Sequence, residues 1–251
     1  MGMADANNGL VIIAMVKFFG FFNRRKGNDH MAKAVFIPFQ RDGVTAADNI
    51  FTTILLGNNG AGKSTLLKTL AGLLPPQSGL MRCPSSISYL GQENRVFWPI
   101  TIGQLLGLSG DSKSSLYRDE LLELLKLTPL LDRRTNELSQ GQLLRARLAR
   151  ALFTKGDLLL LDEPTAALDP PDAETIMAAL KLEATQHRPI IMSGHDLPLA
   201  SRYGDEFLGI CPGGEGRATH KITKEWLEHI YGRPVEGLID GQNMSVTWKL
   251  S

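Results

Sequence analysis

The sequence predicts an α/β fold built around a largely parallel sheet. Short aliphatic and β-branched runs recur along the chain, and each ends in polar or glycine-rich residues: Phe51–Leu56, Ile87–Leu90, Leu158–Leu161 and Pro189–Ser193. Continuous apolar runs of this kind are typical of parallel strands that are buried on both faces. Helical patterns separate the runs, and such alternation predicts a layered α/β domain with its ligand site at the carboxyl ends of the strands.

The bulk composition bounds the size of the domain and the kinds of partner. A chain of 251 residues can bury roughly three quarters of its unfolded surface, which favours one globular unit with a smaller appended subdomain. The formal net charge is +1, so composition alone gives no argument for nucleic acid or an anionic membrane as a partner. Cys83 and Cys211 are far apart in the sequence and have no metal-ligand spacing, which favours reduced thiols.

The first 30 residues contain an apolar stretch, Leu10–Phe22, that Lys17 interrupts. A membrane-spanning helix needs about 20 apolar residues, so this stretch is too short. Its positive charges, Arg24-Arg25-Lys26, follow the apolar part, whereas a secretory signal places them first. An edge strand or an amphipathic surface segment remain as alternatives, and Met31 is an alternative start.

The remaining elements follow in chain order. A leucine-rich helical pattern covers Ser64–Leu74 and stops at two prolines. The part between Gln92 and Gln142 is mainly helical, with a leucine-rich helix after Asp119-Glu120. The last segment begins as a helix around Trp226 and ends in a strand-like tail, Met244–Trp248. We therefore expect a leader or edge segment (1–30), a main core (31–92 and 143–220), a helical subdomain (93–142) and a C-terminal extension (221–251).

A glycine-rich run follows the first predicted core strand and opens the next helix. It is Gly57-Asn58-Asn59-Gly60-Ala61-Gly62-Lys63-Ser64, which matches the phosphate-loop pattern in the context that pattern requires. Glycines allow consecutive backbone N–H groups to surround phosphate oxygens. Lys63 would neutralise the β- and γ-phosphates and the Ser64 hydroxyl would ligate Mg²⁺. The alternative is a glycine-rich turn that happens to precede a helix.

Two carboxylates, Asp162 and Glu163, follow the buried run Leu158–Leu161. Side chains alternate along a strand, so these two should point in different directions and have different roles. We expect Asp162 to hold Mg²⁺ through water, and Glu163 to orient and deprotonate the attacking water. Without the phosphate loop, an acidic pair after a strand would indicate a helix start.

Gln92 and His195 also follow predicted core strands. A ring nitrogen of His195 could donate a hydrogen bond to a γ-phosphate, and the Gln92 amide could contact both Mg²⁺ and water. Each residue alone is more often an ordinary surface or core side chain.

The segment Leu138-Ser139-Gln140-Gly141-Gln142 lies between the phosphate loop and the acidic pair. Ser139 can cap a helix that starts at Gln142, and the free N–H groups of that helix start would attract a phosphate. Because the phosphate loop already supplies one such helix start, a second one indicates that two copies of the chain close over shared nucleotide.

Two further clusters have competing interpretations. Arg145, Arg147 and Arg150 could bind nucleic acid, but the neutral net charge favours a solvated or salt-bridged helix face. Phe97-Trp98-Pro99 is either subdomain core or a docking surface.

Together these motifs resemble the ATP-binding cassette (ABC) transporter ATPase family from about residue 35 onward. The resemblance implies a P-loop NTPase fold with a mixed, largely parallel sheet, an antiparallel β edge and a helical signature subdomain. The matching motifs are the phosphate loop Gly57–Thr65, the Q-loop residue Gln92, the signature Leu138–Gln142, the Walker B strand Leu158–Glu163, the D-loop Ala167-Leu168-Asp169 and the switch histidine His195.

The resemblance also implies cofactors, partners and a location. ATP and Mg²⁺ would bind at a head-to-tail dimer, or at a pair of ATPase subunits, in which Ser139, Gly141 and Gln142 of one subunit reach the γ-phosphate bound at Lys63 of the other. Transmembrane permease subunits would dock beside Gln92, with a substrate-binding protein in the full system and no direct contact with nucleic acid. The subunit would be cytoplasmic and peripheral on the inner face of the membrane.

Some positions depart from the family pattern or narrow it. Gln140 stands where the signature commonly has glycine, and Asn58 where the loop often has proline; Phe36 and Phe39 are candidates for the aromatic residue that stacks on adenine. The short interval from Lys63 to Gln92 resembles ATPases of zinc and manganese importers. The tail Tyr231–Val235 resembles those for iron chelates and cobalamin, so uptake of a metal or metal chelate is the first hypothesis.

Two other functions remain open from the sequence. One is an exporter ATPase of the cytochrome-maturation type, which the sequence hardly separates from an importer. The other is a soluble ABC protein that acts on DNA or ribosomes, which would usually carry two cassettes or a long coiled coil.

Overall fold

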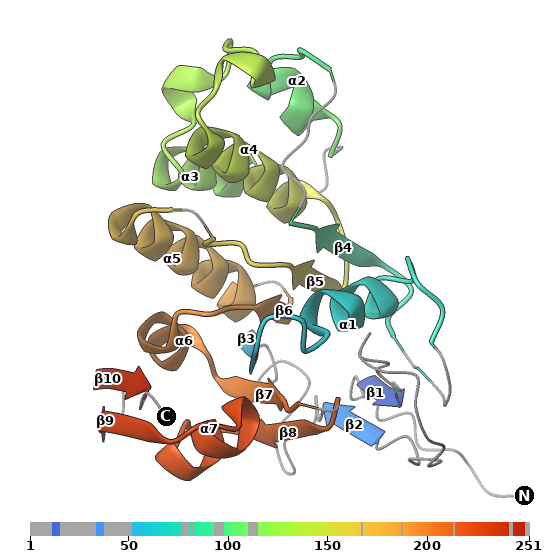
Figure 1. Ribbon diagram of the computed structural model, residues 1–251. Helices are drawn as coiled ribbons and strands as arrows, with labels where there is room; N and C mark the ends of the chain where they lie inside the picture. The colour runs from blue at the N-terminus through green and yellow to red at the C-terminus, as the bar shows by residue number, and fades with distance from the viewer. Residues whose placement is uncertain are drawn as a thin grey trace, which may run out of the picture.

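A computed structural model describes the backbone of residues 12–15, 34–37, 52–76, 81, 83–92, 98–109, 115–166, 168–186, 188–212, 214–240 and 243–248. These residues form a central sheet with helices on both faces, a helical part beside one sheet edge and a C-terminal part beside the other (Figure 1).

Six strands of the described chain form the central sheet. In spatial order they are β4 (Ile87–Leu90), β5 (Leu158–Leu161), β6 (Ile190–Ser193), β3 (Thr52–Gly57), β7 (Glu206–Ile210) and β8 (Gly216–Thr219). All neighbours in this order pair in parallel except β7 and β8, which are antiparallel. The predicted α/β fold with a mixed, largely parallel sheet and an antiparallel edge is therefore confirmed.

The side chains of the buried strands alternate between two apolar cores. In β5, Leu158 and Leu160 belong to the core under α1 (Lys63–Leu70), whereas Leu159 and Leu161 belong to the larger core on the opposite face. Helices α5 (Pro170–Gln186) and α6 (Leu197–Tyr203) cover that opposite face (Figure 1). Because alternate side chains enter cores on opposite faces of the sheet, β5 is apolar at every position.

The larger core is continuous across the described molecule. It contains Leu121 of the helical part, Ile54 of the sheet and Val235 of the C-terminal part. The parts therefore share apolar packing.

Helix α1 is shorter than the leucine pattern predicts. It ends at Leu70 because Gly72 adopts a left-handed conformation with φ of 73°. The N–H groups of Gly72 and Leu73 then donate to the carbonyls of Thr69 and Lys68, which is a Schellman C-cap. Leu73 consequently lies outside the helix and is 61% exposed.

The helical part consists of α2 (Ile102–Gly107), α3 (Ser115–Leu124), two short 3-10 turns (Thr128–Leu130 and Thr135–Glu137) and the start of α4 (Gln140–Phe153). Helix α3 begins before the acidic pair Asp119-Glu120, which lies inside it. Helix α4 begins two residues before the predicted start at Gln142.

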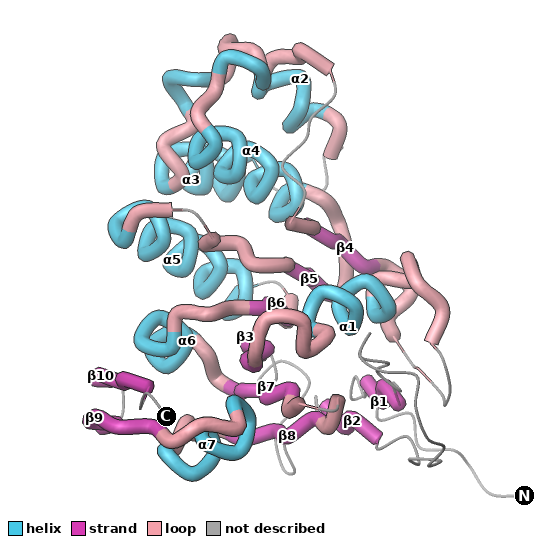
Figure 2. The backbone as a smooth tube through the Cα atoms, viewed as in Figure 1, coloured by secondary structure: helices cyan, strands magenta, loops and turns pink. Residues whose placement is uncertain are grey.

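The C-terminal part consists of α7 (Lys224–Tyr231) and an antiparallel pair, β9 (Val235–Asp240) and β10 (Asn243–Trp248). The sequence predicted the helix and β10 but not β9. The pair stands apart from the central sheet, next to α6 and α7 (Figure 2).

Two strands precede the central sheet. β1 (Ile12–Met15) lies within the apolar stretch Leu10–Phe22 and pairs antiparallel with β2 (Ala34–Ile37), which lies beside β8. No described helix combines the length and apolarity needed to cross a membrane. The candidate Phe39 lies outside the described residues, as does the side chain of Phe36.

Candidate functional site

The phosphate loop connects the carboxyl end of β3 to α1. Gly57, Gly60 and Gly62 have φ values of 147°, 77° and 102°, a region that side chains rarely allow. A Cβ atom on Gly57 would also lie 2.5 Å from the carbonyl oxygen of Ile210, so this position requires glycine. The loop closes as the Ala61 N–H donates to the Asn58 carbonyl at 3.1 Å.

Lys63 is folded into this loop. Its ammonium donates to the carbonyl oxygens of Gly57 at 2.8 Å and Asn58 at 3.0 Å, and the residue is 5% exposed. Burial lowers the pKa of Lys63, and the carboxylates of Glu163 and Asp162 oppose that shift. The loop thus orients a cation toward the space that its own amides surround.

Asp162 is fixed by hydroxyl groups from two other elements. Ser64 Oγ donates to Asp162 Oδ1 at 3.0 Å, and Ser193 Oγ donates to the same oxygen at 2.8 Å. Asp162 is 3% exposed, so these contacts determine where its carboxylate points. They join the carboxyl ends of β5 and β6 to the first turn of α1.

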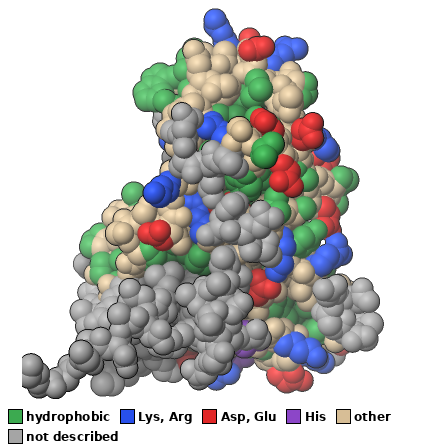
Figure 3. Space-filling view, turned by 180° about the vertical axis from the view of Figure 1, so that it is seen from behind, with side chains coloured by type: hydrophobic (Ala, Val, Ile, Leu, Met, Phe, Trp, Pro, Cys, Tyr) green, Lys and Arg blue, Asp and Glu red, His purple; other side chains and the backbone are tan. Residues whose placement is uncertain are grey.

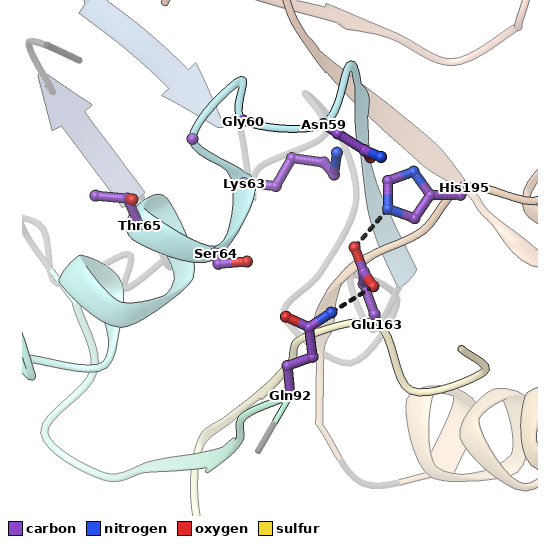
Figure 4. A pocket seen from close by; sticks show the side chains of 9 residues that line it. Asn59, Gly60, Lys63, Ser64, Thr65, Gln92, Glu163 and His195 are labelled. Atoms are coloured by element: carbon purple, nitrogen blue, oxygen red, sulfur yellow. Dashed lines mark hydrogen bonds and ion pairs between the residues drawn. The ribbon is translucent and has the colours of Figure 1, made fainter. Parts of the chain in front are cut away.

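Glu163 has different partners from Asp162. Gln92 Nε2 donates to Glu163 Oε2 at 2.8 Å, and His195 Nε2 contacts Glu163 Oε1 (Figure 4). The backbone of Glu163 is left-handed, with φ of 52°, and its N–H donates to Ser193 Oγ at 2.8 Å. Non-glycine residues rarely adopt this conformation, so the turn after β5 is built to aim this carboxylate.

These side chains line one pocket of about 670 Å³. Its lining consists entirely of predicted site residues: Asn59, Gly60, Gly62, Lys63, Ser64, Thr65, Gln92, Glu163 and His195. Lys63, Gln92, Glu163 and His195 point toward one another across it, whereas the Thr65 side chain points away from Glu163 (Figure 4). Gly57, Asn58, Ala61 and Asp162 support this lining from behind through the contacts described above.

The signature residues lie elsewhere. Among the described residues, Ser139, Gln140, Gly141 and Gln142 are not part of this lining. Ser139 Oγ accepts the Gln142 N–H at 3.2 Å, and Gln142 Oε1 accepts the Ser139 N–H at 3.0 Å. This reciprocal capping box starts α4, with Ser139 and Gln140 exposed.

The D-loop residue Asp169 is exposed and starts α5. Its carboxylate accepts the Asp172 N–H at 3.0 Å, and Asp172 forms ion pairs with Arg145 and Lys126. Arg145 is 7% exposed, so it serves α4–α5 packing. Of the other two arginines, Arg147 donates to the Gly91 carbonyl at 3.3 Å, and Arg150 is exposed.

Trp98 lies close in sequence to Gln92 and is 69% exposed. Its carbonyl accepts the Thr135 hydroxyl at 2.8 Å, which fixes the backbone while the indole faces outward. Of the two interpretations of this cluster, exposure of Trp98 favours a docking surface; Phe97 lies outside the described residues.

The sequence did not identify two residues that contact the site. Ser193 is the last residue of a predicted strand. The strand before Asp162 is its neighbour, and the expectation that both strands end at the same sheet edge was the signal that could have identified Ser193. Tyr231 accepts a hydrogen bond from Asn58 Nδ2 at 3.2 Å through its carbonyl, and no local pattern announces this contact.

Comparisons with known proteins indicate the family to which this chain belongs. A family model described as "ABC transporter" matches residues 50–166. The zinc transport system ATP-binding protein TroB of Treponema pallidum is 33% identical over 200 residues, which cover 71% of this chain and 75% of TroB. The molybdenum import ATP-binding protein ModC of Vibrio parahaemolyticus is 32% identical over 208 residues, which cover 76% of this chain but 56% of ModC.

Other relatives are named as importers of other substrates. The hemin import ATP-binding protein HmuV of Rhodococcus jostii is 30% identical and the thiamine import ATP-binding protein ThiQ of Yersinia pseudotuberculosis is 34% identical, covering 73% and 74% of this chain and 71% and 81% of the respective relative. A solved complex of an archaeal ribosomal stalk protein with the archaeal ribosome recycling factor aABCE1 contains a chain that matches with a TM-score of 0.64 at 28% identity. The match covers 76% of this chain and 39% of that one.

A solved inward-facing structure of a metal-chelate type ABC transporter matches almost the whole chain. The TM-score is 0.71 at 20% identity, and the match covers 96% of this chain and 97% of that one. At this identity the match shows a shared fold. Together with the relatives above, it establishes that the chain belongs to the ABC transporter ATP-binding family, whose members are ATPases.

Proposed function

We propose that this chain binds and hydrolyses ATP in the phosphate-loop pocket and thereby drives a separate membrane permease. The observation that supports this most directly is the arrangement of Glu163. Gln92 and His195 hold its carboxylate in the same pocket as Lys63 and Ser64.

Phosphate binding would rest on the loop amides and Lys63. The buried ammonium has a lowered pKa, and phosphate oxygens would favour its charged form. The triphosphate would therefore receive fixed N–H donors and one cation without rearrangement of the loop backbone.

The residues present fit a Mg²⁺ ion. The Ser64 hydroxyl and the Asp162 carboxylate are oxygen donors of the kind that Mg²⁺ prefers, and they meet 3.0 Å apart beside the pocket. Ser64 would ligate the ion, Asp162 would hold it through water, and the Gln92 amide would contact it. Bound there, Mg²⁺ would neutralise charge on the phosphate oxygens.

Glu163 would orient and deprotonate the attacking water. Gln92 contacts one carboxylate oxygen of Glu163 and His195 contacts the other. These two contacts limit the positions that a water bound to Glu163 can occupy. His195 would in addition donate to the γ-phosphate.

Glu163→Gln tests this assignment. Turnover should fall by about 10²- to 10⁴-fold while ATP binding persists, because the amide keeps the shape of the carboxylate but removes its basicity. Glu123→Gln, the same change at an exposed position on α3, is the matched control and should keep wild-type turnover. Undiminished hydrolysis in Glu163→Gln would show that this carboxylate is not the base.

We infer that the signature acts on nucleotide bound by a second copy. Ser139, Gly141 and Gln142 lie at an accessible helix start outside the pocket of their own chain, and their free N–H groups suit a phosphate. Asp169 is exposed near the same surface. Two chains in head-to-tail orientation would bring each signature to the other chain's Lys63.

Ser139→Arg tests this assembly. It should preserve ATP binding but abolish turnover, because the new side chain blocks the second phosphate contact. Thr101→Arg is the matched control, since Thr101 starts α2 with the same capping box and lies outside the pocket. Wild-type hydrolysis by Ser139→Arg would refute the role in the second subunit's site.

The permease would dock on the helical part near Gln92. The exposed indole of Trp98, which follows Gln92 closely in the sequence, supplies apolar area, and aromatic side chains are enriched in interface cores. Docking would place the subunit on the inner face of the cell membrane, with a substrate-binding protein on the far side.

We propose that the system imports a metal ion or a metal chelate. The names of the zinc, molybdenum and hemin relatives support it, and so does the metal-chelate type fold neighbour. The thiamine relative is equally similar, so the decisive measurement is uptake by the permease purified with this chain.

An action on ribosomes or nucleic acid is less well supported. The match to the complex that contains the archaeal ribosome recycling factor covers only 39% of the matched chain, whereas the import relatives TroB and ModC are matched over 75% and 56% of their length. Acidic and basic side chains of the described residues are also intermixed on the face shown in Figure 3. Binding of RNA that weakens steeply with salt would revive this alternative.

A further inference from the structure

The C-terminal part of the chain is connected to the phosphate loop at Asn58. Helix α7 lies beside β3, the strand that leads into the loop, and ends at Tyr231. Asn58 Nδ2 donates to the Tyr231 carbonyl at 3.2 Å. The chain after Tyr231 turns away at once, because Gly232 is left-handed with φ of 64°.

The Tyr231 side chain is partly buried beside the same loop. Burial raises the pKa of its phenol, and the backbone of Gly57 opposes that rise. The hydrogen bond from Asn58 to the Tyr231 carbonyl is therefore the contact that joins α7 to the loop, directly after Gly57.

These two loop residues are the ones that orient Lys63. Its ammonium donates to the carbonyl oxygens of both Gly57 and Asn58. A displacement of either peptide unit would move the cation that faces the phosphates. The contact with Tyr231 thus acts one step behind the nucleotide.

The hairpin of β9 and β10 holds Tyr231 in turn. The indole of Trp248 packs on the Tyr231 ring, with centroids 4.6 Å apart and planes at 55°. Trp248 pairs with Val235 in the hairpin, and the Val235 N–H donates to Glu228 Oε1 of α7 at 3.0 Å. Trp248 itself is outside the pocket lining, and three contacts, through Tyr231 and Asn58, separate it from Lys63.

Helix α7 has little freedom to shift relative to the loop. A Cβ atom on Gly209 would lie 1.5 Å from Ile230 Cδ1, so α7 packs against the β7 backbone with no space for a side chain. The next residue of β7, Ile210, in turn contacts Gly57 closely. Tight packing of this kind transmits displacements instead of absorbing them.

We propose that Tyr231 and Asn58 are positioning residues for ATP binding, and that the C-terminal hairpin sets the geometry of the phosphate loop through Trp248. This inference rests on the proposed function, since it requires ATP to bind at the loop. It assigns the C-terminal part a role in nucleotide affinity.

The test compares variants at both ends of this chain of contacts. Asn58→Ala removes the hydrogen bond and Trp248→Ala removes the ring that packs on Tyr231. Each should raise the Kd for ATP by about 2- to 10-fold, the range that one hydrogen bond or one aromatic pair supports. Trp248→Phe keeps an aromatic partner and should stay close to wild type. Ser245→Ala, an exposed change in the same hairpin, is the control and should also stay close to wild type.

The full chain is used throughout. Kd is measured by titration calorimetry with MgATP in a Glu163→Gln background, at a temperature where circular dichroism shows every variant folded. In the wild-type background KM should rise with kcat nearly unchanged, because positioning for binding leaves the hydrolytic groups in place. Hydrogen exchange of the amides of residues 57–63 should be faster in Trp248→Ala than in Ser245→Ala.

Other results would overturn the inference. If Trp248→Ala binds ATP as tightly as Ser245→Ala, the hairpin does not position the loop, and ATP binding by the wild type leaves the proposed function standing. An effect of Asn58→Ala alone would mean that Asn58 meets the nucleotide itself. A loss of kcat at constant KM would also refute it. A wild-type chain that does not bind ATP would remove the proposed function and this inference together.

Discussion

Replacement of Arg188 by methionine should destabilise the protein more than any surface substitution. Arg188 is 3% exposed, and its guanidinium donates to five oxygens at 2.7 to 3.4 Å. They belong to Glu183 of α5, Ser88 of β4, the Gly156 carbonyl, and the carbonyls of Ala151 and Leu152 in α4. Tyr117 of α3 donates to the other oxygen of Glu183, so this cluster joins the helical part to the sheet.

The magnitude follows from the burial of Glu183, which is 0% exposed. Removal of one partner of a buried ion pair leaves an uncompensated charge and costs about 3–5 kcal/mol. For a chain of this size that corresponds to a fall in Tm of roughly 6–20 °C. Burial and the hydrogen bond to Glu183 both raise the pKa of Tyr117, so the phenol stays neutral and can offer Glu183 a hydrogen bond but no positive charge.

A double-mutant cycle distinguishes a coupled cluster from separate contacts. Urea denaturation followed by circular dichroism gives the free energy of unfolding for Arg188→Met, Glu183→Gln and the double variant. The double variant should be more stable than the sum of the single costs predicts by at least about 1 kcal/mol, because it no longer buries a lone charge.

Arg202→Met is the matched control for this cycle. Arg202 is 47% exposed and pairs with Glu174 at the surface, so its loss should cost less than about 1 kcal/mol. Additive costs within about 0.5 kcal/mol, or a cost for Arg188→Met as small as that for Arg202→Met, would refute the reasoning.

Two more predictions concern β7. Glu206 is 3% exposed, and burial raises its pKa above the ordinary value of 4.5, against opposing effects of His220 and Thr53. The folded protein therefore takes up this proton at a higher pH than the unfolded chain, so the contribution of Glu206 to stability falls as pH rises from 4.5 through its raised folded pKa. The Tm difference between Glu206→Gln and wild type should grow across that window, and a difference independent of pH would contradict the assignment. Gly209→Ala should cost about 1–3 kcal/mol, because Ile230 Cδ1 occupies the space of the new methyl group. Thermal denaturation measures it, and an unchanged Tm would show that Ile230 can move aside.

The sequence predicted the central strands well where they are apolar at every position. β4 and β5 have the predicted bounds, β6 starts one residue later than predicted, and β3 is displaced by one residue at both ends. These strands are buried on both faces, so local composition and tertiary environment agree. β7 was not predicted because Glu206 and Gly209 interrupt its apolar pattern. Glu206 accepts a hydrogen bond from Thr53, and Gly209 leaves room for the Ile230 side chain, so the reason for each residue lies in a partner that is distant in sequence.

Helix ends were less predictable than helices. Leucines continue at helical spacing as far as Leu74, yet Gly72 ends α1 earlier through a backbone conformation that periodicity does not encode. At α4 the position of the cap was predicted correctly, since Ser139 accepts the Gln142 N–H, although the helix starts at Gln140.

The pocket residues were predictable because they follow buried parallel strands or form a contiguous motif. Lys63, Gln92, Glu163 and His195 converge because the carboxyl ends of β3, β4, β5 and β6 share one edge. Ser193 and Tyr231 were not predicted, since their relevance depends on which strand or helix is adjacent in space. No local spacing could supply that information.

The continuity of the larger core has a consequence for cooperativity. Leu121 and Val235 come from opposite ends of the molecule, yet they belong with Ile54 to one packed cluster. Packing shared in this way favours a single unfolding transition over stepwise melting of parts. The C-terminal part, from Lys221 to Trp248, therefore folds together with the rest of the chain. Its truncation would expose apolar surface of the core that supports the nucleotide pocket.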